Sequence, residues 1–100
     1  MILQPQVVGL KLSLFKIEEL LLGTKNGVNL VFTTPDKFVN SGGIKIGVYL
    51  NGVRLKVGVG NDFTVSESGG VGTGFDTVTL ASGLAPLLGE NLFADYIIDT

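Results

Sequence analysis

The sequence predicts an all-β fold: a small antiparallel β-sandwich of the immunoglobulin-like kind, preceded by an extended N-terminal arm. Three observations lead to this fold class. Short stretches of alternating apolar and polar residues recur at close intervals, residues typical of turns separate them, and no long stretch repeats with helical spacing. A small β-barrel is the alternative architecture that these observations leave open.

The strongest local signal lies in residues 43–57, which read as a β-hairpin. At its centre, Asn51-Gly52 is the dipeptide that most readily adopts the positive φ angles of a type I′ turn. Counting outward from the turn gives four cross-strand pairs: Leu50 with Val53, Tyr49 with Arg54, Val48 with Leu55 and Ile46 with Val57. In this register the branched apolar side chains of both strands share one face, so the rest of the chain must cover them.

The N-terminal residues 1–18 are expected to form an arm or strand for assembly contacts, ahead of a sandwich domain at residues 19–100. Four apolar residues of the arm alternate with other residue types: Val8, Leu10, Leu12 and Leu14. A helix is the alternative, because the apolar residues between Leu10 and Leu21 also fit the spacing of one helical face. Gly9 and the lack of an N-terminal capping residue favour the strand.

Two further elements are expected before the central hairpin. Residues 16–22 form a strand or a short helical turn, which ends at the turn-forming residues 23–27. Residues 28–33 alternate as a strand should. That strand is expected to stop at Thr34, which can cap a single helical turn begun by Pro35.

The second half of the chain alternates between strands and glycine-containing connections. Residues 62–66 form a short strand, and residues 67–74 form an exposed loop, since so many glycines disfavour regular structure. Residues 75–80 form a strand rich in threonine. Residues 91–99 close the chain, and because both of their faces carry apolar groups, we expect them to be a central strand.

Composition excludes several classes of function. The 100-residue chain has no cysteine and no histidine, which removes disulfides, thiolate nucleophiles, imidazole bases and the usual zinc ligand sets. We therefore expect no enzyme, no cofactor and no metal. A net charge of −2 with scattered basic residues argues against nucleic acid. The apolar runs are too short to span a bilayer, so no membrane partner is expected either.

The low fraction of charged residues favours a protein that is part of an assembly. They make up only 16% of the chain, whereas 45% of its residues are hydrophobic. An ordinary soluble domain has about 25% charged residues. Such a surface suits a homo-oligomer or a member of a protein lattice better than a free monomer.

Three acidic or glycine-rich features are weak candidates for chemistry. Glu18 and Glu19 are adjacent, but neighbours on a strand point to opposite faces and cannot act on one bond. Asp62 and Asp76 could offer oxygens to calcium, yet they lack the spacing of a dedicated loop, so turn chemistry is favoured. The glycines of residues 69–74 are not followed by the lysine and helix of a phosphate-binding loop.

Tyr49 beside Arg54 is the remaining candidate. An aromatic ring next to a guanidinium can form a patch that stacks on a sugar or contacts a protein. The alternative is an ordinary cross-strand pair that contributes only to the stability of the sheet.

Taken in order, four stretches of the chain resemble a small β-sandwich module found in structural proteins of tailed bacteriophages. They are residues 23–35 (GTKNGVNLVFTTP), residues 48–55 (VYLNGVRL), residues 61–64 (NDFT) and residues 89–92 (GENL), the last leading to Tyr96. The resemblance spans about residues 19–98, which is most of the chain. Phe63 stands where the family has a tyrosine, and Glu90 stands where it more often has an aspartate.

The resemblance implies a virion structural protein with no catalytic residues. A single module without a fibrous extension resembles a capsid decoration or cement protein, whose partners are the major capsid proteins. A tail, neck or fibre component is the alternative. Either protein would be made in the host cytoplasm and reside in the virion.

Two modes of contact are expected for such a protein. The arm, residues 1–14, can add a strand to a neighbour or exchange with another copy. As an alternative, the loop at residues 66–74, together with Tyr49 and Arg54, can recognise carbohydrate on the host surface.

Overall fold

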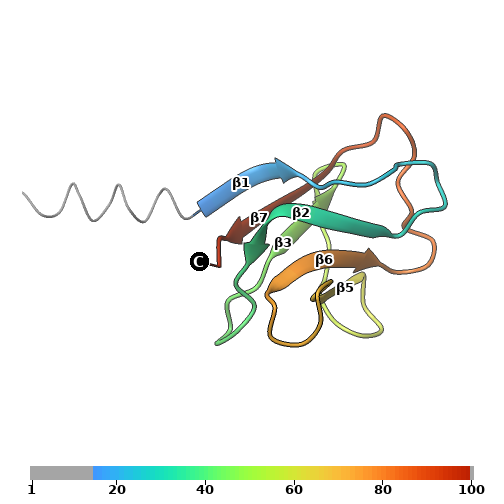
Figure 1. The fold of residues 1–100 in the computed structure, drawn as a ribbon. Helices are drawn as coiled ribbons and strands as arrows, with labels where there is room; N and C mark the ends of the chain where they lie inside the picture. The colour runs from blue at the N-terminus through green and yellow to red at the C-terminus, as the bar shows by residue number, and fades with distance from the viewer. Residues whose placement is uncertain (1–14, 100) are drawn as a thin grey trace, which may run out of the picture.

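The computed structural model describes residues 15–99, which contain seven strands and no helix (Figure 1). In chain order they are β1 Phe15–Leu20, β2 Val31–Phe38, β3 Gly47–Leu50, β4 Val53–Arg54, β5 Phe63–Ser66, β6 Phe75–Leu80 and β7 Leu92–Ile97. Nothing in this part of the chain is a helix long and apolar enough to cross a membrane. Four residues of the predicted arm lie outside the described residues: Val8, Leu10, Leu12 and Leu14.

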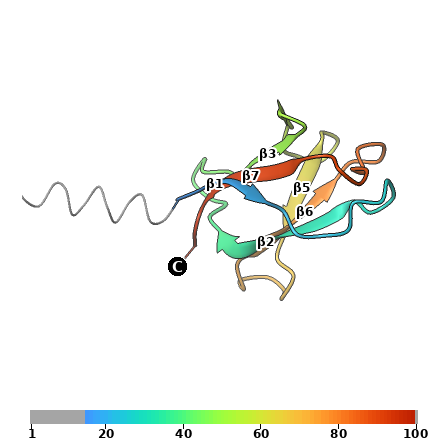
Figure 2. The same ribbon diagram turned by 90° about the horizontal axis from the view of Figure 1, so that it is seen from above.

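The strands form two antiparallel sheets that pack face to face, so the predicted sandwich is confirmed (Figures 1 and 2). One sheet has the order β1-β7-β3-β4 and the other the order β2-β6-β5. Single bridges link the two sheets at their edges: Leu22 with Thr33, Phe38 with Ile98, and Val57 with Phe63. These links do not continue into ladders, so the sheets remain separate layers.

Alternation along β7 shows how the core is built. Leu92, Ala94 and Tyr96 point into the sandwich and are buried, whereas Phe93 and Asp95 point outward. β7 lies between β1 and β3, as predicted for the closing strand. The buried core contains Leu21, Phe32, Phe38, Ile46, Val48, Leu55, Phe63, Val78, Leu80, Leu92, Ala94 and Tyr96.

The predicted turn between β3 and β4 is confirmed. Asn51 and Gly52 have φ angles of 52° and 84°, both positive as a type I′ turn requires. The two pairs next to the turn form in the predicted register: Tyr49 with Arg54 and Leu50 with Val53. One hydrogen bond extends the pairing, from the Leu55 N–H to the Val48 carbonyl at 2.8 Å.

Farther from the turn the predicted register is wrong. The expected pair of Ile46 with Val57 does not form within the described residues, because Val57 bridges Phe63 instead. The Gly58 N–H donates to the Phe63 carbonyl at 2.7 Å, which ties the end of the hairpin to the other sheet. Contacts between the two sheets therefore override the local hairpin register here.

The predicted helical turn at Pro35 is also wrong, since β2 continues through it to Phe38. The register with β6 shifts between Thr33 and Phe38, and the Thr34 hydroxyl donates to the Asp36 carbonyl within this irregular segment. β2 is an edge strand, where the missing N–H of proline breaks no ladder hydrogen bond.

The strand predicted at residues 28–33 begins later, at Val31. The Asn26 side-chain oxygen accepts hydrogen bonds from the N–H groups of Val28 and Asn29, at 2.9 and 2.8 Å. Asparagine thus satisfies locally the groups that a strand would pair.

β1 is a strand and not a helical turn, and it pairs with β7. Residues 15–18, which the sequence assigned to the arm, therefore lie in the four-stranded sheet.

Candidate functional site

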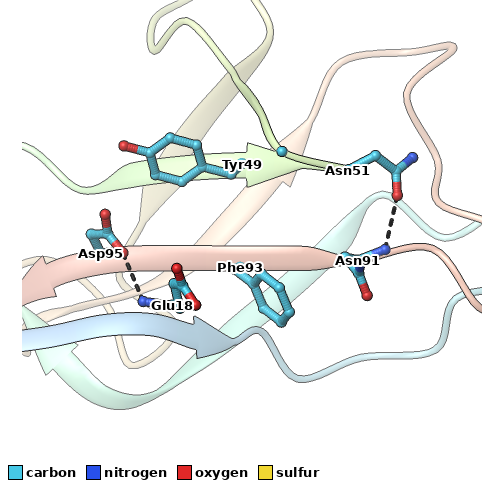
Figure 3. Close-up of a pocket in the computed structure, with 7 residues that line it drawn as sticks. Glu18, Tyr49, Asn51, Asn91, Phe93 and Asp95 are labelled. Carbon is cyan, nitrogen blue, oxygen red and sulfur yellow. Dashed lines mark hydrogen bonds between the residues drawn. The ribbon is translucent and has the colours of Figure 1, made fainter.

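A groove of about 570 Å³ crosses the outer face of the four-stranded sheet (Figure 3). Its lining comes from β1, β3, β7 and the turns at their ends: Glu18, Tyr49, Asn51, Gly52, Asn91, Phe93 and Asp95. This volume lies within the range of small-molecule sites in proteins.

Strand register places the two aromatic residues of the groove on neighbouring strands, with their rings pointing in different directions (Figure 3). Phe93 on β7 is the direct partner of Tyr49 on β3, and both side chains are half-buried. On the other side of β7, Phe93 pairs with Leu20 of β1. The outer face of the sheet therefore carries an apolar strip beside the polar groups of the groove.

A β-bulge in β1 brings Glu18 to the groove. The register with β7 shifts between Lys16 and Glu19, and Glu18 has a φ of 52°, which is rare for a residue with a side chain. Its N–H donates to Oδ1 of Asp95 at 2.7 Å (Figure 3). Bulges of this kind occur next to binding sites because they re-aim a side chain.

Glu18 and Glu19 have different neighbours, as expected for adjacent carboxylates. The Glu19 carboxylate lies 3.8 Å from the Lys16 ammonium and accepts from the Tyr96 hydroxyl at 3.4 Å. Glu18 lines the groove. The two acids therefore do not form a common site.

The predicted neighbours Tyr49 and Arg54 are in contact at the edge of the groove. Nη1 of Arg54 donates to the Tyr49 hydroxyl at 3.1 Å, and the guanidinium carbon lies 5.8 Å from the ring centroid. Gly47 lies beneath this pair, and a Cβ there would be 3.5 Å from Arg54 Nη1. The two side chains thus lie across the sheet over Gly47, at ordinary van der Waals distance from where a Cβ would stand.

Asn51 joins the turn at one end of the groove to the loop before β7. Its side-chain amide donates to Glu90 at 2.8 Å, and its side-chain oxygen accepts from the Asn91 N–H at 3.0 Å (Figure 3). The Glu90 carboxylate also accepts from the Leu87 N–H at 2.7 Å. The Leu87 and Asn51 hydrogen bonds lower the pKa of Glu90 below its ordinary value.

The groove offers hydrogen-bonding groups of both kinds. Glu18 and Asp95 supply carboxylate oxygens, and within residues 15–99 neither forms an ion pair. Arg54 supplies a cation at the edge, and Asn91 supplies an amide. The arrangement can therefore bind a ligand that both donates and accepts hydrogen bonds.

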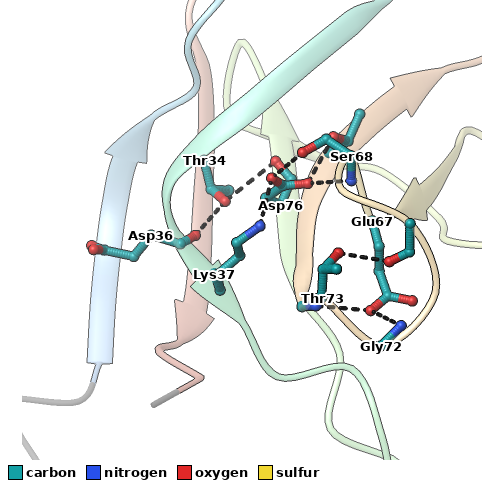
Figure 4. A network of polar contacts seen from close by, with 11 residues as sticks. Thr34, Asp36, Lys37, Glu67, Ser68, Gly72, Thr73 and Asp76 are labelled. Atoms are coloured by element: carbon teal, nitrogen blue, oxygen red, sulfur yellow. Dashed lines mark hydrogen bonds and ion pairs between the residues drawn. The ribbon is translucent and has the colours of Figure 1, made fainter.

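The loop at residues 67–74 does not join this groove. It connects β5 to β6 in the three-stranded sheet (Figure 1), whereas Tyr49 and Arg54 belong to β3 and β4 of the other sheet. Its own Glu67 carboxylate accepts from the N–H groups of Gly72 and Gly74, at 3.0 and 2.8 Å (Figure 4). An internal carboxylate thus occupies the N–H groups that could have held a phosphate.

Asp76 is the centre of a polar network beside that loop (Figure 4). Its carboxylate accepts from the Ser68 N–H at 2.9 Å, the Ser68 hydroxyl at 2.5 Å and the Thr77 hydroxyl at 3.0 Å. The Lys37 ammonium lies 3.0 Å away. Partial burial opposes ionisation, but the hydrogen bonds from Ser68, Lys37 and Thr77 outweigh it and lower the pKa of Asp76 far below its ordinary value.

The other candidate calcium ligand, Asp62, closes a turn. Its carboxylate accepts from the Lys56 N–H at 2.8 Å, and its own N–H donates to the Lys56 carbonyl at 2.8 Å. Nowhere in residues 15–99 do three or more His, Cys, Asp or Glu side chains gather as a metal site would require. Asp62 and Asp76 therefore each stabilise the backbone or loop beside them.

A separate apolar surface lies at the end of the sandwich where two long loops meet (Figures 1 and 2). The Gly27 N–H donates to the Pro86 carbonyl at 2.8 Å, and Leu87 packs over Gly27. Three aliphatic side chains project from these loops: Val28, Leu87 and Leu88, which are 79%, 59% and 89% exposed. We call these three residues the apolar loop patch.

Sequence reasoning named Tyr49 and Arg54 but missed Phe93, Asp95, Asn91 and the role of Glu18. The signal was present in residues 91–99, whose outward face combines an aromatic ring with a carboxylate. Which strands flank that face depends on pairing between segments more than 40 residues apart.

No protein-family model, characterised protein or solved structure matches this chain. The likeness to modules of tailed bacteriophages therefore rests on the four sequence stretches alone.

Proposed function

We propose that this chain is a structural protein of a tailed-bacteriophage virion, a capsid decoration or cement protein that binds the head lattice through protein–protein contacts. Its partners are the major capsid proteins and further copies of itself. It is made in the host cytoplasm and resides on the capsid. A tail, neck or fibre component, in contact with carbohydrate of the host surface, is the alternative.

The observation that carries this proposal is the apolar loop patch. Val28, Leu87 and Leu88 project into solvent from two loops that hydrogen bonds hold together. Several exposed aliphatic groups on loops held together in this way are typical of a surface that other proteins cover. An apolar patch at one end of the sandwich would allow that end to bind the surface of a protein lattice.

Composition and the resemblance support the same role. The charged fraction of 16% leaves little of the surface strongly hydrated. A two-sheet sandwich is also the fold that the resemblance to virion modules implies. No residue of the proposal is required to perform chemistry.

Immunogold labelling of purified particles of the encoding phage tests the location. Gold on the heads is expected for a decoration protein. Gold on tails or necks would favour the alternative, and unlabelled particles that contain no peptide of this chain by mass spectrometry would refute a virion role.

A charge placed in the patch tests the surface. Leu88→Asp should reduce incorporation into particles at least about tenfold, because an aspartate buried in an interface costs more than 1.4 kcal/mol. Val71→Asp is the matched control, since Val71 is fully exposed on the β5–β6 loop. Equal incorporation of both folded variants would exclude the patch.

Removal of residues 1–14 tests the arm separately. If Val8, Leu10, Leu12 and Leu14 contact a neighbour, the shortened protein should fold but lose occupancy on particles. Unchanged occupancy would rule out the contribution of the arm and leave that of the patch intact.

A further inference from the structure

We propose that the groove on the outer face of the four-stranded sheet binds a neutral saccharide. This site lies apart from the loop of residues 66–74, and it would supply the carbohydrate contact of the alternative function. The inference does not depend on a virion location, because the groove is present in the isolated domain.

Apolar surface in the groove has the form that sugar rings use. Tyr49 and Phe93 are direct cross-strand partners and half-buried, and their rings extend to different sides of the groove (Figure 3). Large rigid aromatic groups provide contact area at low conformational cost. The C–H faces of a pyranose can pack on such rings while its hydroxyls stay available for hydrogen bonds.

Charges around the groove select against ionic ligands. A cation that approaches Asp95 also meets the positive charge of Arg54, whose guanidinium lies over Gly47, the cross-strand partner of Asp95. An anion that approaches Arg54 meets the Asp95 carboxylate. A neutral ligand avoids both repulsions.

Hydrogen-bonding groups in the groove match a polyhydroxylated ligand. Sugar hydroxyls can donate to the carboxylates of Glu18 and Asp95 and accept from the side-chain amide of Asn91. A hydroxyl is both donor and acceptor, so one ligand can satisfy all of these groups. Few other neutral compounds combine this capacity with an apolar face.

The groove is held in place by the fold on two sides. The bulge at Glu18 is tied to Asp95 by the 2.7 Å hydrogen bond. At the other end, Asn51 binds Glu90 and the Asn91 N–H. A site built on strands and fixed turns loses little entropy when a ligand binds.

Titration of ¹⁵N-labelled protein with neutral oligosaccharides of glucose, galactose, mannose and N-acetylglucosamine tests the proposal. At least one should shift the backbone amide signals of Tyr49, Asn91 and Phe93, with a dissociation constant of about 1 mM or below. Lysine amide and inorganic phosphate are the charged probes and should bind at least about tenfold more weakly.

Substitutions inside and outside the groove test where the saccharide binds. Phe93→Ala and Glu18→Gln should each weaken binding about tenfold or more, while Phe15→Ala, on the same outer face but outside the groove, should change it less than about twofold. Urea unfolding verifies that each variant is folded. No shift with any oligosaccharide at about 10 mM, shifts confined to residues 67–74, or tighter binding of a charged probe would overturn the proposal. None of these outcomes bears on the particle-labelling test.

Discussion

Asp95 on the central strand β7 accepts a hydrogen bond from the backbone N–H of Glu18, 2.7 Å away on the neighbouring strand β1. The contact replaces a ladder hydrogen bond at the place where the two strands lose register. The Asp95 carboxylate thus provides a hydrogen-bond acceptor for the backbone N–H of the bulge. The same bulge sets the position of a carboxylate at the groove.

The first prediction concerns strain at this bulge. Glu18→Gly should raise the free energy of unfolding by about 0.5–1 kcal/mol, because glycine adopts the φ of 52° without the steric cost that a side chain incurs. The midpoint of urea unfolding measures the change.

Glu19→Gly is the matched control for that substitution. Glu19 lies in β1 next to Glu18 but has no positive φ, so glycine there should lower stability by about 0.5–1 kcal/mol or more. Equal losses from both substitutions would show that the bulge conformation carries no strain.

The second prediction concerns the Asp76 network. Asp76→Asn should lower the free energy of unfolding at pH 7 by about 1–3 kcal/mol, because the charged hydrogen bonds from Ser68 and Lys37 are weakened. Asp99→Asn, at an exposed carboxylate, should change it by less than about 0.5 kcal/mol.

Lowering the pH should weaken the contribution of the Asp76 network to the free energy of unfolding. The pKa of Asp76 is lowered in the folded protein, so the unfolded chain takes up this proton more readily. The stabilisation is complete above about pH 5, where an ordinary aspartate is fully ionised, and is lost progressively as the pH falls below that. Urea unfolding at pH 7 and pH 3 should show a smaller acid loss for Asp76→Asn than for the natural chain, and identical losses would contradict this role.

Parts of the fold that depend on local chemistry could be predicted from the sequence. Asn51 and Gly52 adopt the backbone angles of the turn by themselves, so the two pairs beside them follow. The strand at residues 75–80 was predicted with its observed bounds, because glycines end before it and the alternation is regular.

Features that depend on distant partners could not be predicted in this way. Pro35 looked like the start of a helical turn, and only its place on an edge strand makes an extended conformation acceptable. Glu18 reads as an ordinary strand residue, yet the register of β1 against β7 gives it a positive φ. The groove follows from the order β1-β7-β3, which joins residues far apart in the chain.

The third prediction concerns Asn51, which contributes both a backbone angle and two side-chain hydrogen bonds. Asn51→Ala should lower the free energy of unfolding by about 1–3 kcal/mol, since alanine disfavours the φ of 52° and makes neither bond. Asn51→Gly keeps the angle and should cost less.

Amide hydrogen exchange reports the loss of the side-chain contribution of Asn51, and the difference in stability between the two variants reports the backbone contribution. In both variants the Asn91 N–H loses its side-chain acceptor and should exchange faster. If Asn51→Gly destabilises as much as Asn51→Ala, the backbone angle has no part in the effect.

The fourth prediction concerns Gly23, where the chain passes from β1 toward β2. A Cβ at this position would lie 2.5 Å from Cδ2 of Phe32, a ring that is 1% exposed in the core. Because that ring is enclosed, the backbone must move to relieve the overlap. Gly23→Ala should therefore lower the free energy of unfolding by about 2–4 kcal/mol, from overpacking and from the positive φ together.

Gly83→Ala separates these two causes, because Gly83 also has a positive φ, of 94°, but nothing lies within 4 Å of its added Cβ. It should cost only the backbone term, about 1 kcal/mol, as measured by urea unfolding. The difference between the two variants then measures how firmly the core holds Phe32. Equal costs would mean that the ring moves aside freely, and the two sheets would then not be closely packed at this edge.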